Sequence, residues 1–193
     1  LRSSAATTVA ATSFLANRAG IRIFATGGLG GVHRGASNSF DESADIPMLA
    51  ETPITVVSAG VKSVLDIQAT LERLETLSIP VIGFKTDTFR LDWSIESAED
   101  VARVMRARDE LGLRQGIVLA NPVPQDQAWD VDEHDDILAQ ALQLAEEQGI
   151  TGKGVTPFLL LEIVKLSGGK SLEVNLDLAR NNVRVAGQVA KAW

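Results

Sequence analysis

Apolar residues along the chain gather in short runs that alternate with segments of helical spacing. The short runs predict buried strands and lie at 21–26, 54–59, 81–84 and 116–120. Apolar residues at helical spacing predict helices at 4–19, 63–77 and 98–111, and helices dominate the rest of the chain. This alternation predicts an α/β fold, with a largely parallel sheet and helices on both faces, built as a single domain over residues 1–193.

The polar residues with unusual chemistry follow the predicted strands. Ligands of parallel sheets gather beyond the carboxyl ends of the strands, so we expect the functional site at that edge. Residues 86–97 show little periodicity. They join a predicted strand to a predicted helix, and we interpret them as a candidate mobile lid.

Composition excludes several classes of protein. The chain of 193 residues has a formal net charge of −7, which argues against a surface that binds nucleic acid. It has no cysteine, so a metal would be held by oxygen or imidazole ligands, which favours Mg²⁺ or Mn²⁺ over Zn²⁺. No apolar run approaches the roughly 20 residues that span a bilayer, and no signal peptide is recognisable. We therefore expect a soluble, cytoplasmic protein without a membrane partner.

A glycine-rich stretch, GGLGGVHRG, follows the first predicted strand at 27–35. Glycines let backbone N–H groups approach an anion, and His33 and Arg34 can add side-chain donors. The stretch is no dinucleotide fingerprint, because the third glycine of that pattern would fall on His33, and no Walker sequence follows. The alternative is a tight turn with an exposed histidine and arginine.

An acidic motif, FDESAD, comes next at 40–45. Asp41 and Asp45 are four residues apart, so on a helical turn their carboxylates would share a face and could bind a divalent cation. The alternative is an acidic helix N-terminus, which the helix dipole stabilises. Taken alone, the motif favours the alternative.

Lys62 lies two residues beyond the second predicted strand, where we expect a helix to begin. A surface lysine is the commoner case. Held near the buried strand end and a helix N-terminus instead, its ammonium would be disfavoured, and the neutral amine could attack a carbonyl.

Two amide-rich segments lie further along, at 120–124 (ANPVP) and 175–182 (NLDLARNN). Amides are unfavourable in a helix interior, where alanine, leucine or lysine is preferred. Buried amides usually tie down backbone, although they can also bind the edge of a base.

Together these pieces resemble the pseudouridine-5′-phosphate glycosidase family, which includes proteins linked to indigoidine gene clusters. The motifs that carry the resemblance cover almost the whole chain in one order: TTVAAT, FATGGLGGVHRGA, FDESAD, TPITVVSAGVKSVLD, LETLSIPVIGFKTD, VLANPVP, GITGKGVTPFLL and SGGKSLEVNLDLARNN.

The resemblance implies a manganese-dependent homotrimer that splits pseudouridine 5′-phosphate into uracil and ribose 5-phosphate. In AGVKS, Lys62 matches the nucleophile that forms a Schiff base with the ring-opened sugar, and Asp41 matches the metal ligand. The other matched positions contact the substrate or organise water near the metal: Val9 through its backbone, Ser43 and Asp45, Thr26 and His33 near the sugar phosphate, and Asn175 near the uracil.

The chemistry explains the need for a lysine. Carbon is a poor leaving atom, so an oxocarbenium route of the kind used on ordinary glycosides does not suffice. A protonated imine between Lys62 and C1′ acts as an electron sink while uracil is released. The same imine serves synthesis in the reverse direction.

Relative to the resembled family, the chain lacks an N-terminal portion that carries a catalytic glutamate and a phosphate-binding lysine, and its loop at 88–91 is shorter. Two alternatives therefore stand beside the glycosidase. One is a truncated, inactive homologue that binds sugar phosphate or metal, and the other is a different Schiff-base lyase acting on sugar phosphates.

Overall fold

The computed structural model describes residues 7–86, 91, 93–123 and 128–193. Contacts divide the chain into two compact units, Leu1–Pro122 with Ala179–Trp193, and Val123–Leu178. The first unit contains the sheet and the second is helical. The extent of a single domain over the whole chain stays a prediction.

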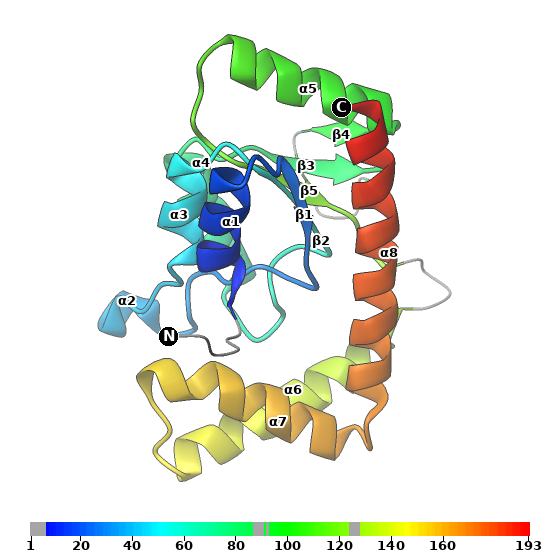
Figure 1. Ribbon diagram of the computed structural model, residues 1–193. Coiled ribbons are helices and arrows are strands. Elements are labelled where there is room, and N and C mark those ends of the chain that lie inside the picture. The colour runs from blue at the N-terminus through cyan, green and yellow to red at the C-terminus, as the bar shows by residue number, and fades with distance from the viewer. Residues whose placement is uncertain (1–6, 87–90, 92, 124–127) are drawn as a thin grey trace, which may run out of the picture. The chain divides into compact units, whose positions relative to one another are not determined.

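Five parallel strands form the sheet, in the order β1-β2-β5-β3-β4. The strands are β1 (Ile23–Ala25), β2 (Thr55–Ser58), β3 (Val81–Phe84), β4 (Ser94–Ile95) and β5 (Ile117–Ala120). The predicted α/β class and parallel sheet are confirmed. All carboxyl ends therefore lie at one edge, where Figure 1 shows the loops that follow β1 and β2.

Helices cover both faces of the sheet, as the sequence predicts. On one face, Val57 and Leu119 pack with α5 (Ala98–Glu110) and the C-terminal part of α8 (Lys170–Ala192). On the other face, Val56 and Val118 lie in a second cluster. The helices that cover this second face are α1 (Val9–Arg18), α3 (Asp45–Glu51) and α4 (Ile67–Thr76), grouped on one side of the strands in Figure 1. Alternate residues of each buried strand thus face different helices.

The segment 86–97 contains a strand that the sequence did not indicate. Ser94 and Ile95 form β4, and Lys85 N donates to Ile95 O at 2.8 Å while Gly83 N donates to Trp93 O at 2.9 Å. Pairing with β3, a tertiary contact, makes this edge strand. Residues 87–90 and 92 lie outside the described residues, so the lid stays a prediction, as does the shorter loop at 88–91.

The second unit contains α6 (Val131–Glu147), a 3₁₀ turn (Gly152–Gly154), α7 (Val155–Leu166) and the start of α8. Asp130 caps α6 by accepting from Glu133 N at 3.0 Å. Lys170 pairs with Glu133 and lowers the pKa of that carboxyl below its usual range. This pairing ties the first turn of α8 to the first turn of α6.

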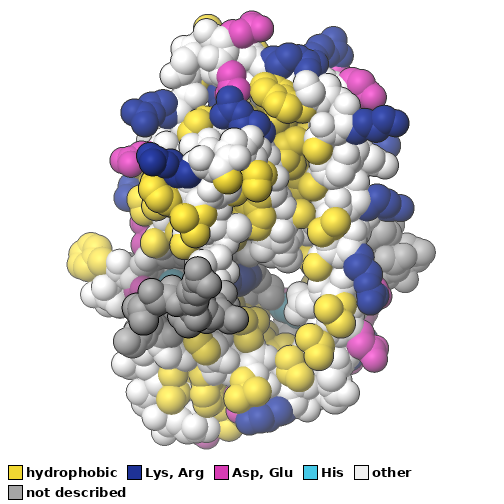
Figure 2. Space-filling view, viewed as in Figure 1, with side chains coloured by type: hydrophobic (Ala, Val, Ile, Leu, Met, Phe, Trp, Pro, Cys, Tyr) yellow, Lys and Arg dark blue, Asp and Glu magenta, His cyan; other side chains and the backbone are white. Residues whose placement is uncertain are grey.

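The described helices include none that is both long and apolar enough to cross a membrane. On the face drawn in Figure 2, the coloured Lys and Arg side chains are scattered among acidic and apolar ones.

Candidate active site

The loops that follow β1 and β2 lie against each other at the carboxyl edge of the sheet. Leu29 N donates to Gly60 O at 2.9 Å, and Lys62 N donates to Leu29 O at 3.1 Å. The loop at 27–31, which we call the glycine loop, therefore runs beside the segment that carries Lys62. Two motifs far apart in the sequence form one surface.

Lys62 is half-buried, and its side chain lies over Gly28. A Cβ atom placed on Gly28 would come within 3.3 Å of Lys62 Cγ, so the glycine leaves room for the lysine stem. The expected helix N-terminus beside Lys62 is wrong: Lys62 O accepts from Leu65 N in a turn, and α4 begins only at Ile67.

Asp45 joins the glycine loop to the start of α1. Its buried carboxylate accepts from Ala10 N through Oδ1 at 2.9 Å and from Gly30 N through Oδ2 at 2.8 Å. Val9 is buried at the first position of α1, next to one of these donors. The carboxylate thus holds together two elements that carry predicted substrate contacts, Val9 and the glycine loop.

Gly30 is required by close approach. A Cβ atom there would lie 2.2 Å from Ser43 Oγ and 2.6 Å from Asp45 Oδ2. Ser43 Oγ in turn accepts from Asp45 N at 3.2 Å, and Ser43 N donates to Gly31 O at 2.9 Å. The GGLGG and FDESAD motifs therefore pack closely against each other.

The prediction that Asp41 and Asp45 share one face of a helical turn is wrong. Asp45 is the first residue of α3, whereas Asp41 precedes the helix. Asp41 O accepts from His33 N at 3.0 Å, and its carboxylate lies 3.6 Å from His33 Nδ1. The pairing of backbones between the two motifs turns Asp41 toward His33. The alternative, a carboxylate in the first turn of a helix, holds for Asp45.

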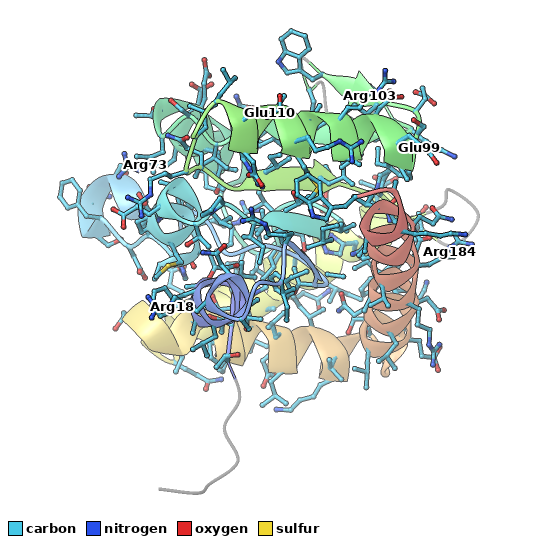
Figure 3. The ribbon with its side chains drawn as sticks, turned by 45° about the horizontal axis from the view of Figure 1, so that its top comes forward. Arg18, Arg73, Glu99, Arg103, Glu110 and Arg184 are labelled. Carbon is cyan, nitrogen blue, oxygen red and sulfur yellow. The ribbon has the colours of Figure 1, made fainter. Side chains whose placement is uncertain are left out.

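Asp41 is the candidate for holding a metal. In the part of the chain that the structure describes, no three His, Asp or Glu side chains come together as a metal site. The carboxylate of neighbouring Glu42 is paired with Arg73 at 2.8 Å. Arg73 is labelled in Figure 3. Asp41 lines a groove of about 810 Å³ with His33 and has a side chain 34% exposed. One accessible carboxylate fits Mg²⁺ or Mn²⁺, which keep several waters, better than Zn²⁺.

The amide-rich segments contribute two residues that the sequence did not single out. Asn182 on α8 is fully buried, and its Nδ2 donates to Thr26 O at 2.7 Å. Asn121, after β5, donates from Nδ2 to Asn182 Oδ1 at 2.8 Å. The interpretation that buried amides tie down backbone is confirmed here, and amides inside a helix were the signal. Asn175, the residue matched to uracil binding, is exposed and belongs to the second unit.

Known proteins are similar to this chain over nearly its whole length. The family model described as "Indigoidine synthase A like protein" matches residues 1–192. A pseudouridine-5′-phosphate glycosidase of Frankia alni is 60% identical over 97% of this chain and 55% of the relative. Another from Saccharopolyspora erythraea is 51% identical over 98% of this chain and 66% of the relative. The chain thus spans between half and two thirds of the length of these relatives.

Two crystal structures have the same fold. A prealnumycin C-glycosynthase in complex with ribulose 5-phosphate is 35% identical with a TM-score of 0.89, covering 97% of this chain and 65% of that one. An indigoidine synthase A-like protein of Thermotoga maritima is 39% identical with a TM-score of 0.85, covering 95% and 63%. With a family model matched along nearly its whole length, the chain belongs to the indigoidine synthase A-like family.

Proposed function

We propose that the chain carries the catalytic lysine of a pseudouridine-5′-phosphate glycosidase, which reversibly splits its substrate into uracil and ribose 5-phosphate. The observation that carries this proposal is Lys62, which is half-buried four residues beyond the end of β2 and packed over the glycine loop. The names of the relatives, at up to 60% identity, supply the substrate. The enzyme acts in the cytoplasm as a homotrimer in this proposal.

Lys62 forms the covalent intermediate. Its neutral Nζ bonds to C1′ of the sugar as the C1′–O4′ bond breaks and O4′ takes up a proton. A proton is then delivered to C5 of uracil, the C1′–C5 bond breaks, and the nitrogen lone pair forms the C=N bond of a protonated imine. Water adds to the imine carbon, which releases ribose 5-phosphate and restores Lys62.

The surrounding residues bind the sugar phosphate in this proposal. Ser43 packs against the glycine loop, and Thr26 and His33 flank that loop in the sequence. The N–H groups of Leu29 and Gly30 are already bonded within the protein, so the side chains of Thr26, His33 and Ser43 supply donors for an anionic ligand in this proposal. The related C-glycosynthase was crystallised with ribulose 5-phosphate, which supports a sugar phosphate as ligand of this fold. Val9 contributes a backbone contact, and Asn175 binds the uracil. Asp45 acts on the substrate through the glycine loop, because both of its oxygens already accept backbone N–H groups.

Asp41 would hold Mn²⁺ or a similar divalent cation. When bound, such an ion orients water and sugar hydroxyl groups near the reacting carbon. The carboxylate of Asp41 itself lies beside His33, so the two side chains limit each other's rotation.

Removing the carboxylate of Asp41 should weaken metal binding. We expect Asp41→Asn to raise the dissociation constant for Mn²⁺ by about tenfold or more, since it removes a charged oxygen ligand. The free Mn²⁺ signal in electron paramagnetic resonance measures this without turnover. Glu42→Gln is the matched control, because Glu42 is held by Arg73. Equal affinity in both variants would remove Asp41 from the site.

The function itself is tested by reductive trapping. Borohydride added to the purified chain with ribose 5-phosphate should leave a sugar-phosphate adduct that peptide mapping places on Lys62. Formation of pseudouridine 5′-phosphate on addition of uracil separates the glycosidase from another Schiff-base lyase. Binding of ribose 5-phosphate without any adduct would instead support the binding-only homologue.

A further inference from the structure

A pair of buried asparagines lies behind the loops of the candidate active site. Asn182 comes from α8 near the C-terminus, and Asn121 follows β5 directly. Both side chains are more than nine-tenths buried. Their mutual hydrogen bond and the bond from Asn182 Nδ2 to Thr26 O connect the end of the edge strand β1 with the end of the central strand β5.

Hydrogen bonds link this asparagine pair to the carboxyl ends of β1, β2 and β5. Asn121 N donates to Ser58 O at 2.7 Å, at the end of β2, and Thr26 N donates to Val57 O at 2.9 Å. Asn182 thus bridges the carboxyl ends of β1 and β5, with β2 between them. Thr26 is the last residue before the glycine loop, so its carbonyl is the point from which that loop departs.

The glycine loop depends on such a fixed point. Glycine has the largest backbone freedom of any residue, and Gly27 and Gly28 have no side chains that could anchor them. Yet Gly28 packs directly under Lys62 Cγ. A displacement of about 1 Å at a reacting group can cost roughly a hundredfold in rate.

We propose that Asn182 is a positioning residue: by holding Thr26 O, it keeps the glycine loop against Lys62 and so aims the amine at C1′ of the substrate. This inference rests on the proposed function. Asn121 supports it by orienting the amide of Asn182, so that Nδ2 faces Thr26.

The chain provides a matched control at the adjacent position. Asn181 lies on the same helix, and its Oδ1 accepts from Arg184 at 2.6 Å on the exposed side. Figure 3 shows Arg184 on the outward side of α8. Asn182→Leu removes both buried bonds with little change in volume, and Asn181→Leu makes the same chemical change outside the pair.

Hydrogen exchange tests positioning without any need for activity. In Asn182→Leu, the amides of the glycine loop should exchange about tenfold faster than in Asn181→Leu, because a buried hydrogen bond has been lost. The amides of β3 should be unchanged. Equal exchange of the glycine loop in the two variants overturns the proposal, even where the wild-type chain forms no adduct and the proposed function fails.

Trapping kinetics test the consequence for Lys62. Where the wild-type chain forms the adduct, Asn182→Leu should lower the maximal trapping rate about tenfold or more, with a smaller change in the half-saturating concentration of ribose 5-phosphate. An unchanged maximal rate in Asn182→Leu overturns the proposal, even with a looser loop.

A conservative variant distinguishes the loss of positioning from a general disruption of the structure. In Asn182→Asp, a protonated carboxyl can donate to Thr26 O and accept from Asn121. Burial favours that neutral form, which also predominates at low pH. Below neutral pH this variant should trap faster than Asn182→Leu, and equal rates there would overturn the positioning role.

Discussion

Replacing Lys62 by alanine should abolish the borohydride-trapped adduct and reduce turnover by about a thousandfold or more. Loss of a nucleophile removes the covalent route altogether, and such losses are among the largest that single substitutions cause. Intact mass after reduction in the presence of ribose 5-phosphate measures the first effect. Release of uracil from pseudouridine 5′-phosphate measures the second.

Lys85 offers a matched control for this experiment. It too lies beyond the carboxyl end of a strand, directly after β3, but it is exposed and its ammonium lies over the ring of Phe84. Lys85→Ala should keep both the adduct and the turnover. Near-normal turnover in Lys62→Ala, or an adduct that maps to Lys85, would refute the assignment of the nucleophile.

Asp45→Ala should be the most destabilising substitution in the candidate site, lowering the free energy of unfolding by about 2–5 kcal/mol. The change leaves Ala10 N and Gly30 N without their acceptor, and each unsatisfied buried donor costs roughly 1–3 kcal/mol. Urea unfolding followed by circular dichroism measures the change.

A second aspartate, Asp66, provides a comparison for the loss of stability in Asp45→Ala. Asp66 caps α4 by accepting from Ala69 N at 3.0 Å, so Asp66→Ala should cost about 1 kcal/mol. A loss in Asp45→Ala no larger than in Asp66→Ala would show that the bridge from α1 to the glycine loop contributes little. Asp45 would then be free to contact substrate instead.

The strands β2, β3 and β5 were predictable because they are buried on both faces. β3 occupies the predicted residues 81–84, since a strand covered by helices on both sides is a continuous apolar run. β4 was not predictable, because two residues have no periodicity and exist as a strand only through pairing with β3. The start of α4 was misplaced by four residues, since the turn after Lys62 contains apolar Val64 and Leu65, which suit a helix equally well.

The candidate site was predictable as a set of motifs but not as a geometry. The possible chemistry of the candidate residues is evident from their types alone, in the GGLGG and FDESAD motifs and at Lys62. Spacing suggested that Asp41 and Asp45 act together, yet backbone pairing between residues 33 and 41 separates them. The bond from Asn182 to Thr26 spans 156 residues, and no local pattern could indicate it.

The sequence by itself determined the α/β class, the parallel sheet and the candidate residues, because burial and residue chemistry leave local marks along a chain. Only the tertiary structure decided which side chains hydrogen-bond to backbone groups and which remain available to bind a ligand or take part in catalysis. Asp45 satisfies two distant N–H groups, whereas Asp41 keeps a partly exposed carboxylate. The physical reason is that buried backbone donors require acceptors, and which carboxylate meets them depends on how distant segments pack.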